Sequence, residues 1–362
     1  AGPAGTSLIV GLPGSDNTRD YRQFLVGVYG QDEYRVRPNM LLTMGLRYEF
    51  TTKVHDRNDK DIFLLDRLND TTVQSGETFG RNPAYRNFAP RIGLRWNPFS
   101  GRGTLVQAGI GIFFDQLLVY SASQRKATFP TYNLVINPNF SSSGTFPNAV
   151  AAAALPGTSR GRITTMDYQN TMTPTVYRYS TSIQQPLPGG WDATLAYVGA
   201  RGNHLLRRYE ANQFPFSVRL PDGSLCFPPD ASVVRAQDLA RNPACQPVST
   251  LRAGPMNPNF GSNDLLATDG QSFFNTVQVG ASKRLANGIS LQSSYTFSKS
   301  VDDDSTGNTT SQFQYPIDRL SERGLSEFDI RHRFVQNFFW TPPLGKGHKL
   351  MSSGVGNLLL GN

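Results

Sequence analysis

Six charged residues occupy alternate positions in segments whose remaining positions are largely apolar. They are Arg47, Glu49, Arg91, Arg95, Arg178 and Arg333. Guanidinium groups bind carboxylates and phosphates through paired, charge-assisted hydrogen bonds, so a face rich in arginine could hold an acidic ligand or a neighbouring domain. The alternative is that the five arginines pair with acidic residues such as Glu49 and Asp329, or face water. Charged side chains are costly in lipid but tolerated in a watery lumen, so these six are candidates for lining the lumen of a membrane protein.

The two cysteines, Cys226 and Cys245, both fall in one long polar segment. Disulfides persist outside the cytoplasm, so an extracellular position of this segment would favour a disulfide between them. Two free thiols or a metal pair are the alternatives. No histidine lies near enough in sequence to complete a metal set, and we expect the disulfide.

Three consecutive acidic residues, Asp302, Asp303 and Asp304, follow a predicted strand. Carboxylate oxygens are suitable ligands for Ca²⁺. The run lacks the alternating spacing of a dedicated calcium loop, however, and a solvated acidic tip is the interpretation we favour.

The sequence contains no recognisable catalytic constellation. The four histidines have no zinc-binding spacing, and no nucleophile elbow, phosphate-binding glycine loop or dinucleotide fingerprint occurs. We therefore expect no enzyme activity, no cofactor and no metal site.

Composition favours a membrane β-barrel over other classes. Hydrophobic residues make up 38% and charged residues 17% of the 362 residues, and both values are low for a globular protein. Aromatic residues reach 11%, which is too many for a disordered chain. The net charge of +8 comes from scattered basic residues rather than a basic run, so we expect no nucleic-acid partner. No apolar run approaches the length of a spanning helix.

The clearest structural unit is a predicted hairpin from Ser272 to Ser298. In its second strand, 289–298, apolar residues at 289, 291, 295 and 297 alternate with Ser, Thr and Gln. Alternation of this kind indicates a strand with one apolar and one polar face. The dipeptide Asn287-Gly288 suits a tight turn between the two strands.

The same unit recurs along the chain. Strands are predicted at residues 22–37, 41–50, 89–97, 104–114, 175–187, 191–205, 272–284, 289–298 and 327–341. Short turns near 38, 98–103, 187–190, 285–288 and 342–347 alternate with long loops at 51–88, 115–173, 206–271 and 299–326. This alternation is typical of an all-β, antiparallel transmembrane β-barrel with short periplasmic turns and long extracellular loops. A soluble β-sandwich or solenoid is the alternative, but structureless loops of this length are rare in compact domains.

Several segments resemble the barrel of TonB-dependent outer-membrane transporters of the Oar-like group, whose members carry a carboxypeptidase-regulatory-like domain ahead of a plug. They are Val28–Val36 (VYGQDEYRV), Gly45–Glu49 (GLRYE), Asn87–Gly93 (NFAPRIG), Ala196–Leu205 (AYVGARGNHL), Ser294–Ser300 (SYTFSKS) and Phe328–Phe334 (FDIRHRF). They occur in the family's order across most of the chain.

The resemblance implies a Gram-negative outer-membrane receptor that binds a ligand with its extracellular loops and passes it through the lumen. Family barrels have about 22 strands, and about nine or ten are expected here, so residues 1–362 are predicted to be part of one barrel domain. The plug and the C-terminal strands are expected elsewhere, with the TonB complex acting through the plug. A passive porin-like barrel, a barrel for adhesion or export, and a soluble secreted β-protein are the alternatives.

Overall fold

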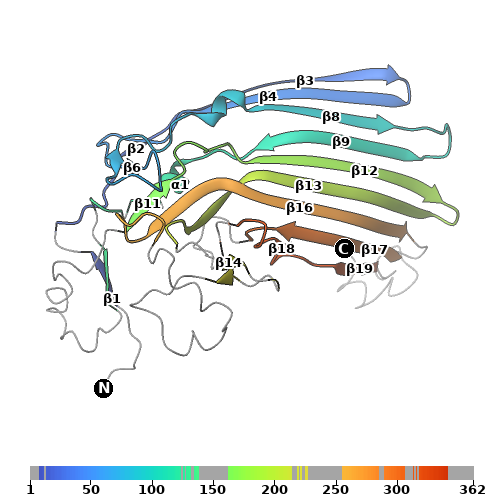
Figure 1. The fold of residues 1–362 in the computed structure, drawn as a ribbon. Coiled ribbons are helices and arrows are strands. Elements are labelled where there is room, and N and C mark those ends of the chain that lie inside the picture. Colours follow the sequence, from blue (N-terminus) through green and yellow to red (C-terminus); the bar gives the residue numbers. More distant parts are fainter. Residues whose placement is uncertain are drawn as a thin grey trace, which may run out of the picture.

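The computed structural model describes residues 8–11, 14–123, 125–126, 128–131, 134–137, 162–213, 218–219, 221, 225–226, 255–284, 289–305, 313, 315 and 318–340. Most of these residues belong to one antiparallel sheet of 11 strands or to the folded loops at one end of it (Figure 1).

Nine long strands form the sheet in the order β17-β16-β13-β12-β9-β8-β4-β3, with β19 on the other side of β17. Their bounds are β3 Leu25–Arg37, β4 Met40–Thr51, β8 Phe88–Trp96, β9 Leu105–Phe114, β12 Thr175–Leu187, β13 Trp191–Glu210, β16 Asn263–Arg284, β17 Ile289–Asp302 and β19 His332–Trp340. Each long strand pairs with its neighbours in sequence, as predicted. Two short strands complete the sheet, β11 (Ile163–Met166) parallel to β16 and β18 (Gly324–Leu325) antiparallel to β17.

The pairing register gives the sheet two unlike faces. Residues paired directly across a sheet point to the same face, and neighbours in a strand point to opposite faces. One row joins Met44, Ile92, Ile110 and Tyr179. The adjacent row, on the opposite face, joins Thr43, Gly93, Gly109 and Ser180. The alternation in the sequence therefore becomes one continuous apolar face and one continuous polar face.

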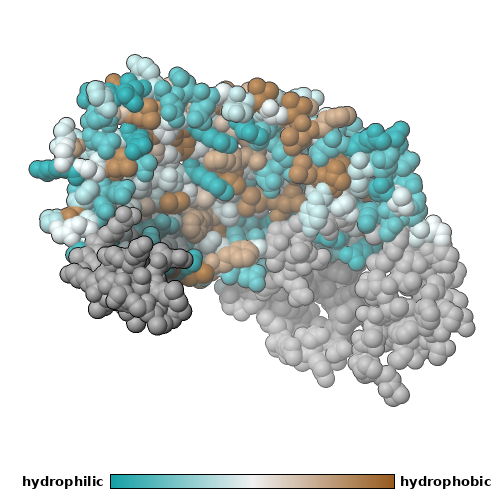
Figure 2. All heavy atoms as spheres, turned by 180° about the vertical axis from the view of Figure 1, so that it is seen from behind, coloured by the Kyte–Doolittle hydropathy of each residue, from teal (hydrophilic) through white to brown (hydrophobic). Residues whose placement is uncertain are grey.

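Large apolar side chains are exposed along the apolar face. Ile110 is 57% exposed and Leu195 is 51% exposed. Figure 2 shows hydrophobic residues spread across the body of the molecule, with hydrophilic residues gathered towards both ends. A band of this kind matches the surface that an outer-membrane barrel presents to lipid.

The close packing of an aromatic ring on the apolar face explains why residue 199 is a glycine. The ring of Tyr179 covers Gly199, where an added Cβ would lie 2.1 Å from a ring carbon. Tyr179 thereby reaches across β13 and donates its hydroxyl hydrogen bond to Asn275 Oδ1 at 3.1 Å. Tyr197 donates to the same oxygen at 2.7 Å.

Short turns close the hairpins at one end of the sheet. Pro38 and Asn39 join β3 to β4, and Gly189 and Gly190 lie between β12 and β13. Both glycines have positive φ angles, 76° and 75°, which favour glycine over other residues. The predicted turns at 285–288 and 342–347 lie outside the described residues.

At the opposite end, the strands β13 and β16 are longer than predicted. The expected loop at 206–271 in fact begins and ends with strand, because β13 continues to Glu210 and β16 begins at Asn263. Two register shifts lie between Asn203 and Arg207, and β16 bends at its outer end (Figure 1). Ion pairs stabilise this extension, with Arg207 Nε 2.9 Å from Asp269 Oδ1. Its charged residues break the apolar alternation, which is why the pattern did not predict a strand there.

The last strand begins later than expected. Strand β19 covers residues 332–340, not the predicted 327–341. The Ser298 hydroxyl donates to the Ile330 carbonyl at 2.6 Å, and the Ser300 amide donates to Asp329 Oδ1 at 2.7 Å. Side chains therefore take part in the contacts of β17 with this segment.

The long connections, together with the segment that precedes β3, pack into a loop layer, defined here by residues 14–24, 52–87, 115–123, 125–126, 128–131, 162–174 and 206–213. Its short elements are β2 (Tyr21–Arg22), β5 (His55–Asp56), β6 (Ile62–Phe63), β7 (Gln74–Ser75), a 3-10 helix η1 (Pro83–Arg86) and α1 (Val119–Ser123). The remaining pairs are β1 (Leu8–Gly11) with β10 (Leu134–Asn137), and β14 (Val218–Arg219) with β15 (Leu225–Cys226). Among the described helices, none is long and apolar enough to span a membrane.

The hydrophobic core lies in this layer and its contacts with the ends of the strands. One buried cluster contains Ile62, Leu64, Ile163 and Phe260. A second contains Phe79, Leu117, Met166 and Leu266. The predicted polar loop at 51–88 is thus a packed structure, which can position side chains as a flexible loop cannot.

Candidate functional site: the polar face and the loop pocket

All six charged residues singled out in the sequence lie on the polar face. Arg91 pairs with Gly45 and Gly111, and Gly111 pairs with Arg178. Arg47 and Glu49 share the parity of Gly45 on β4. A single row across the sheet connects Arg95 on β8 with Arg333 on β19, through Gln107, Ser182, Ala196, Gln278 and Thr296. The structure therefore places the six on one face but does not bring them into one contact group.

Two of the arginines converge on one aromatic ring. The guanidinium carbon of Arg91 lies 4.5 Å from the centroid of Phe113, and that of Arg178 lies 5.3 Å from it. We call these three residues the Phe113 cluster. Gly111 gives them room, because an added Cβ would lie 3.1 Å from the Arg91 Cγ and 3.2 Å from the Phe113 ring.

The Phe113 cluster carries two cations whose attraction to the ring leaves their hydrogen-bond donors available. Within the described residues, neither arginine has a carboxylate at ion-pair distance. A cation held over an aromatic face contributes about 0.5–1 kcal/mol at an exposed site. The ring fixes the guanidiniums in place without neutralising them, so the cluster is suited to anionic groups. The sequence placed Phe113 on this face but gave no sign that both arginines would meet on it.

Arg47 behaves differently, as the alternative interpretation anticipated. Its Nε lies 2.5 Å from Glu49 Oε1, so the two side chains neutralise each other. A hollow of about 170 Å³ beside this pair is lined by Arg47 and Arg91 together with Tyr29, Gln31 and the backbone of Gly45.

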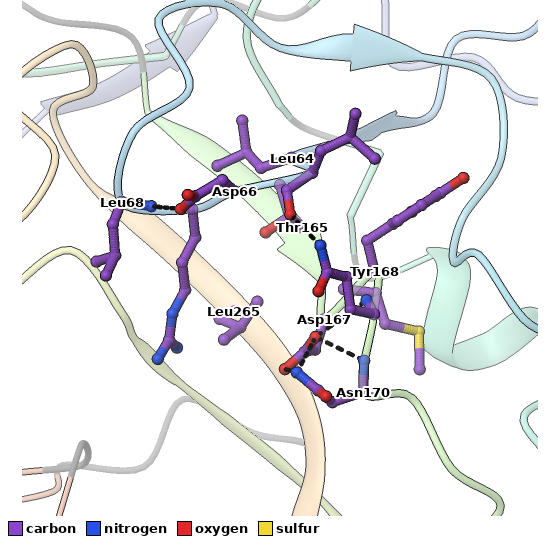
Figure 3. A pocket seen from close by; sticks show the side chains of 12 residues that line it. Leu64, Asp66, Leu68, Thr165, Asp167, Tyr168, Asn170 and Leu265 are labelled. Atoms are coloured by element: carbon purple, nitrogen blue, oxygen red, sulfur yellow. Dashed lines mark hydrogen bonds between the residues drawn. The ribbon is translucent and has the colours of Figure 1, made fainter.

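A second pocket, of about 330 Å³, lies in the loop layer (Figure 3). It is formed by segments 64–68 and 165–170, with Leu265 from β16. The Gln169 side-chain amide donates to the Leu65 carbonyl at 2.7 Å and joins the two segments. Tyr168 stacks on Phe63, with ring centroids 4.2 Å apart.

The two carboxylates of this pocket, Asp66 and Asp167, serve mainly to shape its walls. Asp66 Oδ1 accepts the Leu68 amide at 2.9 Å, and Asp167 Oδ1 accepts the Asn170 amide at 3.0 Å. The hydrogen bond from the Asn69 side chain, followed by that of the Leu68 amide, holds the pKa of Asp66 below its usual value. The pocket walls are thus fixed by turns, and they offer amides, carboxylates and leucine side chains to a small polar ligand.

Sequence reasoning assigned ligand binding to the outer loops but named none of these residues. The available signals were Asp66 and Asp167, each followed within three residues by an asparagine. Such residues favour turns in which the side chain accepts backbone amides.

The remaining predicted residues have mixed outcomes. Asp303 is 4% exposed, and its carboxylate accepts hydrogen bonds from Arg319 Nη1 at 2.7 Å and the Gln271 amide at 2.8 Å. It is therefore a buried ion-pair partner, and the prediction of a solvated tip is wrong for this residue. Across the described part of the chain, no group of three or more His, Cys, Asp or Glu residues could hold a metal. Cys226 ends β15, whereas Cys245 lies outside the described residues, so the disulfide stays a prediction.

One continuous antiparallel sheet, with an apolar face, a polar face, short turns at one end and a loop layer at the other, defines a β-barrel protein of the outer membrane. The chain belongs to the outer membrane beta barrel domain family, whose model matches residues 7–362. The predicted fold class and the outer-membrane location are thereby confirmed, and the soluble secreted alternative is excluded. None of the curated proteins compared matches the chain.

Similar solved structures include proteins from Escherichia coli, Pseudomonas aeruginosa and Neisseria meningitidis. The outer membrane transporter YddB from Escherichia coli is 12% identical, with a TM-score of 0.46 over 87% of this chain and 31% of that one. The siderophore receptor PirA from Pseudomonas aeruginosa is 13% identical, with a TM-score of 0.37 over 77% and 34%. The FrpB iron transporter from Neisseria meningitidis is 15% identical, with a TM-score of 0.36 over 77% and 26%. The chain spans about a quarter to a third of the length of these proteins.

Proposed function

We propose that this chain is the part of a TonB-dependent, Oar-like outer-membrane transporter that captures a ligand in its loop layer and lines the passage with its polar face. The observation that carries the proposal is that the polar face continues directly into the loop layer. The strands that hold the Phe113 cluster, β8, β9 and β12, lead directly into the loops that form the pocket (Figure 1).

The division between the faces supports a passage rather than a solid structural wall. Gly93, Gly109, Ser180 and Ser182 line a broad hollow of about 500 Å³ on the polar face, together with Glu33 and Arg95. Small side chains keep this surface open. Charged groups spaced along it favour a water-filled lumen, since they would be costly against lipid.

The loop pocket supports selective binding over free diffusion. A passive pore needs no preformed recess, whereas a receptor benefits from walls fixed before the ligand arrives, because less ordering is then lost on binding. The turns around Asp66 and Asp167 supply such walls.

The experiment compares nutrient depletion from defined medium by three strains: wild type, a deletion of this gene, and a deletion of tonB. Transport coupled to TonB predicts that the same compound is depleted more slowly in both deletion strains. A compound affected by deletion of this gene but not of tonB would contradict the proposal and favour a passive pore.

A pocket variant then links uptake to the structure. Leu68 lines the pocket and is 44% exposed, so Leu68→Glu should slow depletion of that compound without affecting assembly. Leu320→Glu is the matched control, since Leu320 is an exposed leucine, at 66%, that does not line the pocket. Equal uptake by the Leu68→Glu variant and wild type would refute the role of this pocket.

A further inference from the structure

A second group of arginines converges on an aromatic ring, but on the apolar face. The guanidinium carbon of Arg201 on β13 lies 5.0 Å from the centroid of Phe273 on β16. That of Arg323, which precedes β18, lies 4.6 Å from the same centroid. Lys299 on β17 is paired in register with Asn275, two residues from Phe273 on the same face. We call these four residues the Phe273 cluster.

The register establishes that this cluster belongs to the apolar face. Arg201 pairs with Tyr177 on one side and with Phe273 on the other, and Phe273 pairs with Val301. Arg201 also has the same parity on β13 as Leu195, which is 51% exposed. The cluster therefore faces the surroundings of the barrel, on the side opposite the Phe113 cluster.

The order of side chains along β16 fixes the depth of the cluster. From the turn end of β16, Lys283 and Ala281 come first on this face, and the exposed apolar residues Val279 and Val277 come next. Asn275 follows, where the hydroxyls of Tyr179 and Tyr197 meet. Tyrosines gather at membrane–water interfaces because the ring is apolar and the hydroxyl is polar. Phe273 lies one step further out, towards the loop layer, so its arginines stand just outside the hydrocarbon boundary.

The cations of the cluster are not neutralised by the protein. Arg201, Lys299 and Arg323 are exposed, and none has a carboxylate at ion-pair distance within the described residues. Nearby acids are otherwise engaged: Asp303 binds Arg319, Asp329 lies 3.6 Å from Arg331, and Glu322 accepts the Tyr315 amide. Three like charges held in two neighbouring rows of a lipid-facing surface call for an anionic partner from the membrane.

We propose that the Phe273 cluster binds the phosphate-bearing headgroup of an outer-leaflet lipid. Arginine offers several donors in a fixed plane, which match phosphate oxygens, and Lys299 adds a point charge. The exposed apolar residues below, such as Val277 and Tyr295, would contact the acyl chains of the same lipid. This inference depends on the outer-membrane location and not on the proposed transport function.

The test measures binding of lipid A to the full-length protein, purified in detergent, by native mass spectrometry. Diphosphorylated lipid A should bind more tightly than the dephosphorylated form. Each basic residue near a charged lipid surface contributes about 1 kcal/mol, so Arg323→Gln should weaken binding roughly 5-fold and Arg201→Gln with Arg323→Gln roughly 30-fold. Arg323 lies outside the long strands, so its single variant keeps the test valid if the double variant assembles poorly.

The matched control is Arg102→Gln. Arg102 also lies over a phenylalanine, 5.6 Å from the centroid of Phe99, but in the turn at the opposite end of the sheet. The Arg102→Gln variant should leave lipid A binding unchanged. Equal binding of both lipid forms to wild type, or unchanged binding by the double variant, would overturn the proposal. Full displacement of lipid A by an equal concentration of inorganic phosphate would also overturn it, because the site would then recognise free phosphate.

Discussion

Replacing Asp61 by asparagine should open the loop layer without disturbing the sheet. Asp61 is 1% exposed, and its Oδ2 lies 3.2 Å from Arg125 Nη2. Its Oδ1 accepts the Tyr21 hydroxyl at 2.9 Å and lies 3.8 Å from Arg19 Nε. Asp56 supplies the second carboxylate, 3.9 Å from Arg19. Two buried cations are thus balanced by two buried anions.

The free-energy cost of the Asp61→Asn substitution follows from this balance of charges. Asp61→Asn leaves Arg125 buried with no carboxylate among the described residues, and its Nε and Nη1 already make no hydrogen bond. Removing one partner of a buried ion pair costs about 3–5 kcal/mol. At about 1.4 kcal/mol per tenfold change, opening of the loop layer should become roughly 10²- to 10⁴-fold more frequent.

Amide hydrogen exchange of the lipid-embedded protein measures this opening directly. Peptides from residues 54–64 should lose protection, whereas peptides from β9 and β12 should not. Asp59→Asn is the control, since the Asp59 side chain is 66% exposed and should change stability by no more than about 0.5 kcal/mol. Exchange of the Asp61→Asn variant at the wild-type rate would refute the assignment of a buried ion-pair network.

A double variant separates the missing charge from lost packing. Buried ion pairs can often be replaced by apolar residues of similar volume at no cost. Asp61→Leu combined with Arg125→Met should therefore exchange more slowly than Asp61→Leu alone. If the double variant opened as readily as the single one, the uncompensated charge of Arg125 would not be the cause.

Three further predictions follow from the faces of the sheet and the outer loops. Ile110→Lys should lower the stability of the membrane-inserted protein by about 2–4 kcal/mol in urea unfolding, while Ser180→Lys, one row away on the polar face, should cost far less; equal losses would contradict the face assignment. Gly199→Val should displace the Tyr179 ring, because the added Cβ would lie 2.1 Å from it, and should lower the urea midpoint; an unchanged midpoint would contradict the fit. Burial raises the pKa of Glu210, at the outer end of β13, so the folded state holds its proton more tightly and stability falls as pH rises through its titration. Glu210→Gln should consequently stabilise the loop layer in hydrogen exchange at neutral pH but not at pH values where the carboxyl is protonated, and equal stability of variant and wild type at neutral pH would refute this.

The sequence predicted the sheet well because its faces have a strict period of two. All nine predicted strands exist, and the polar-face position of residues such as Arg91 and Arg178 follows from alternation alone. Alternation acts within a strand, however, and carries no information about which residues of different strands meet. The convergence of Arg91 and Arg178 on Phe113 depends on register across β8, β9 and β12, which only the structure provides.

The loop layer was the part that the sequence could not predict. The outer ends of β13 and β16 carry Arg207, Arg208, Asp264 and Asp269, whose charges suggest solvent rather than strand. Ion pairs between neighbouring segments stabilise these residues, since Arg208 and Arg162 both bind Asp264. The pocket joins segments about 100 residues apart through Gln169 and the Leu65 carbonyl, a contact with no local sequence signal.

The most direct test of the central claim, that one face of this sheet contacts lipid and the other a watery lumen, is a spin-label scan of β12. Single cysteines would replace residues 177–184 in turn, in the membrane-inserted protein with Cys226 and Cys245 replaced by alanine. We predict that accessibility to oxygen, which partitions into lipid, peaks at 177, 179, 181 and 183. Accessibility to a water-soluble nickel complex should peak at 178, 180, 182 and 184. Equal accessibility at odd and even positions, or peaks in the opposite order, would contradict the account.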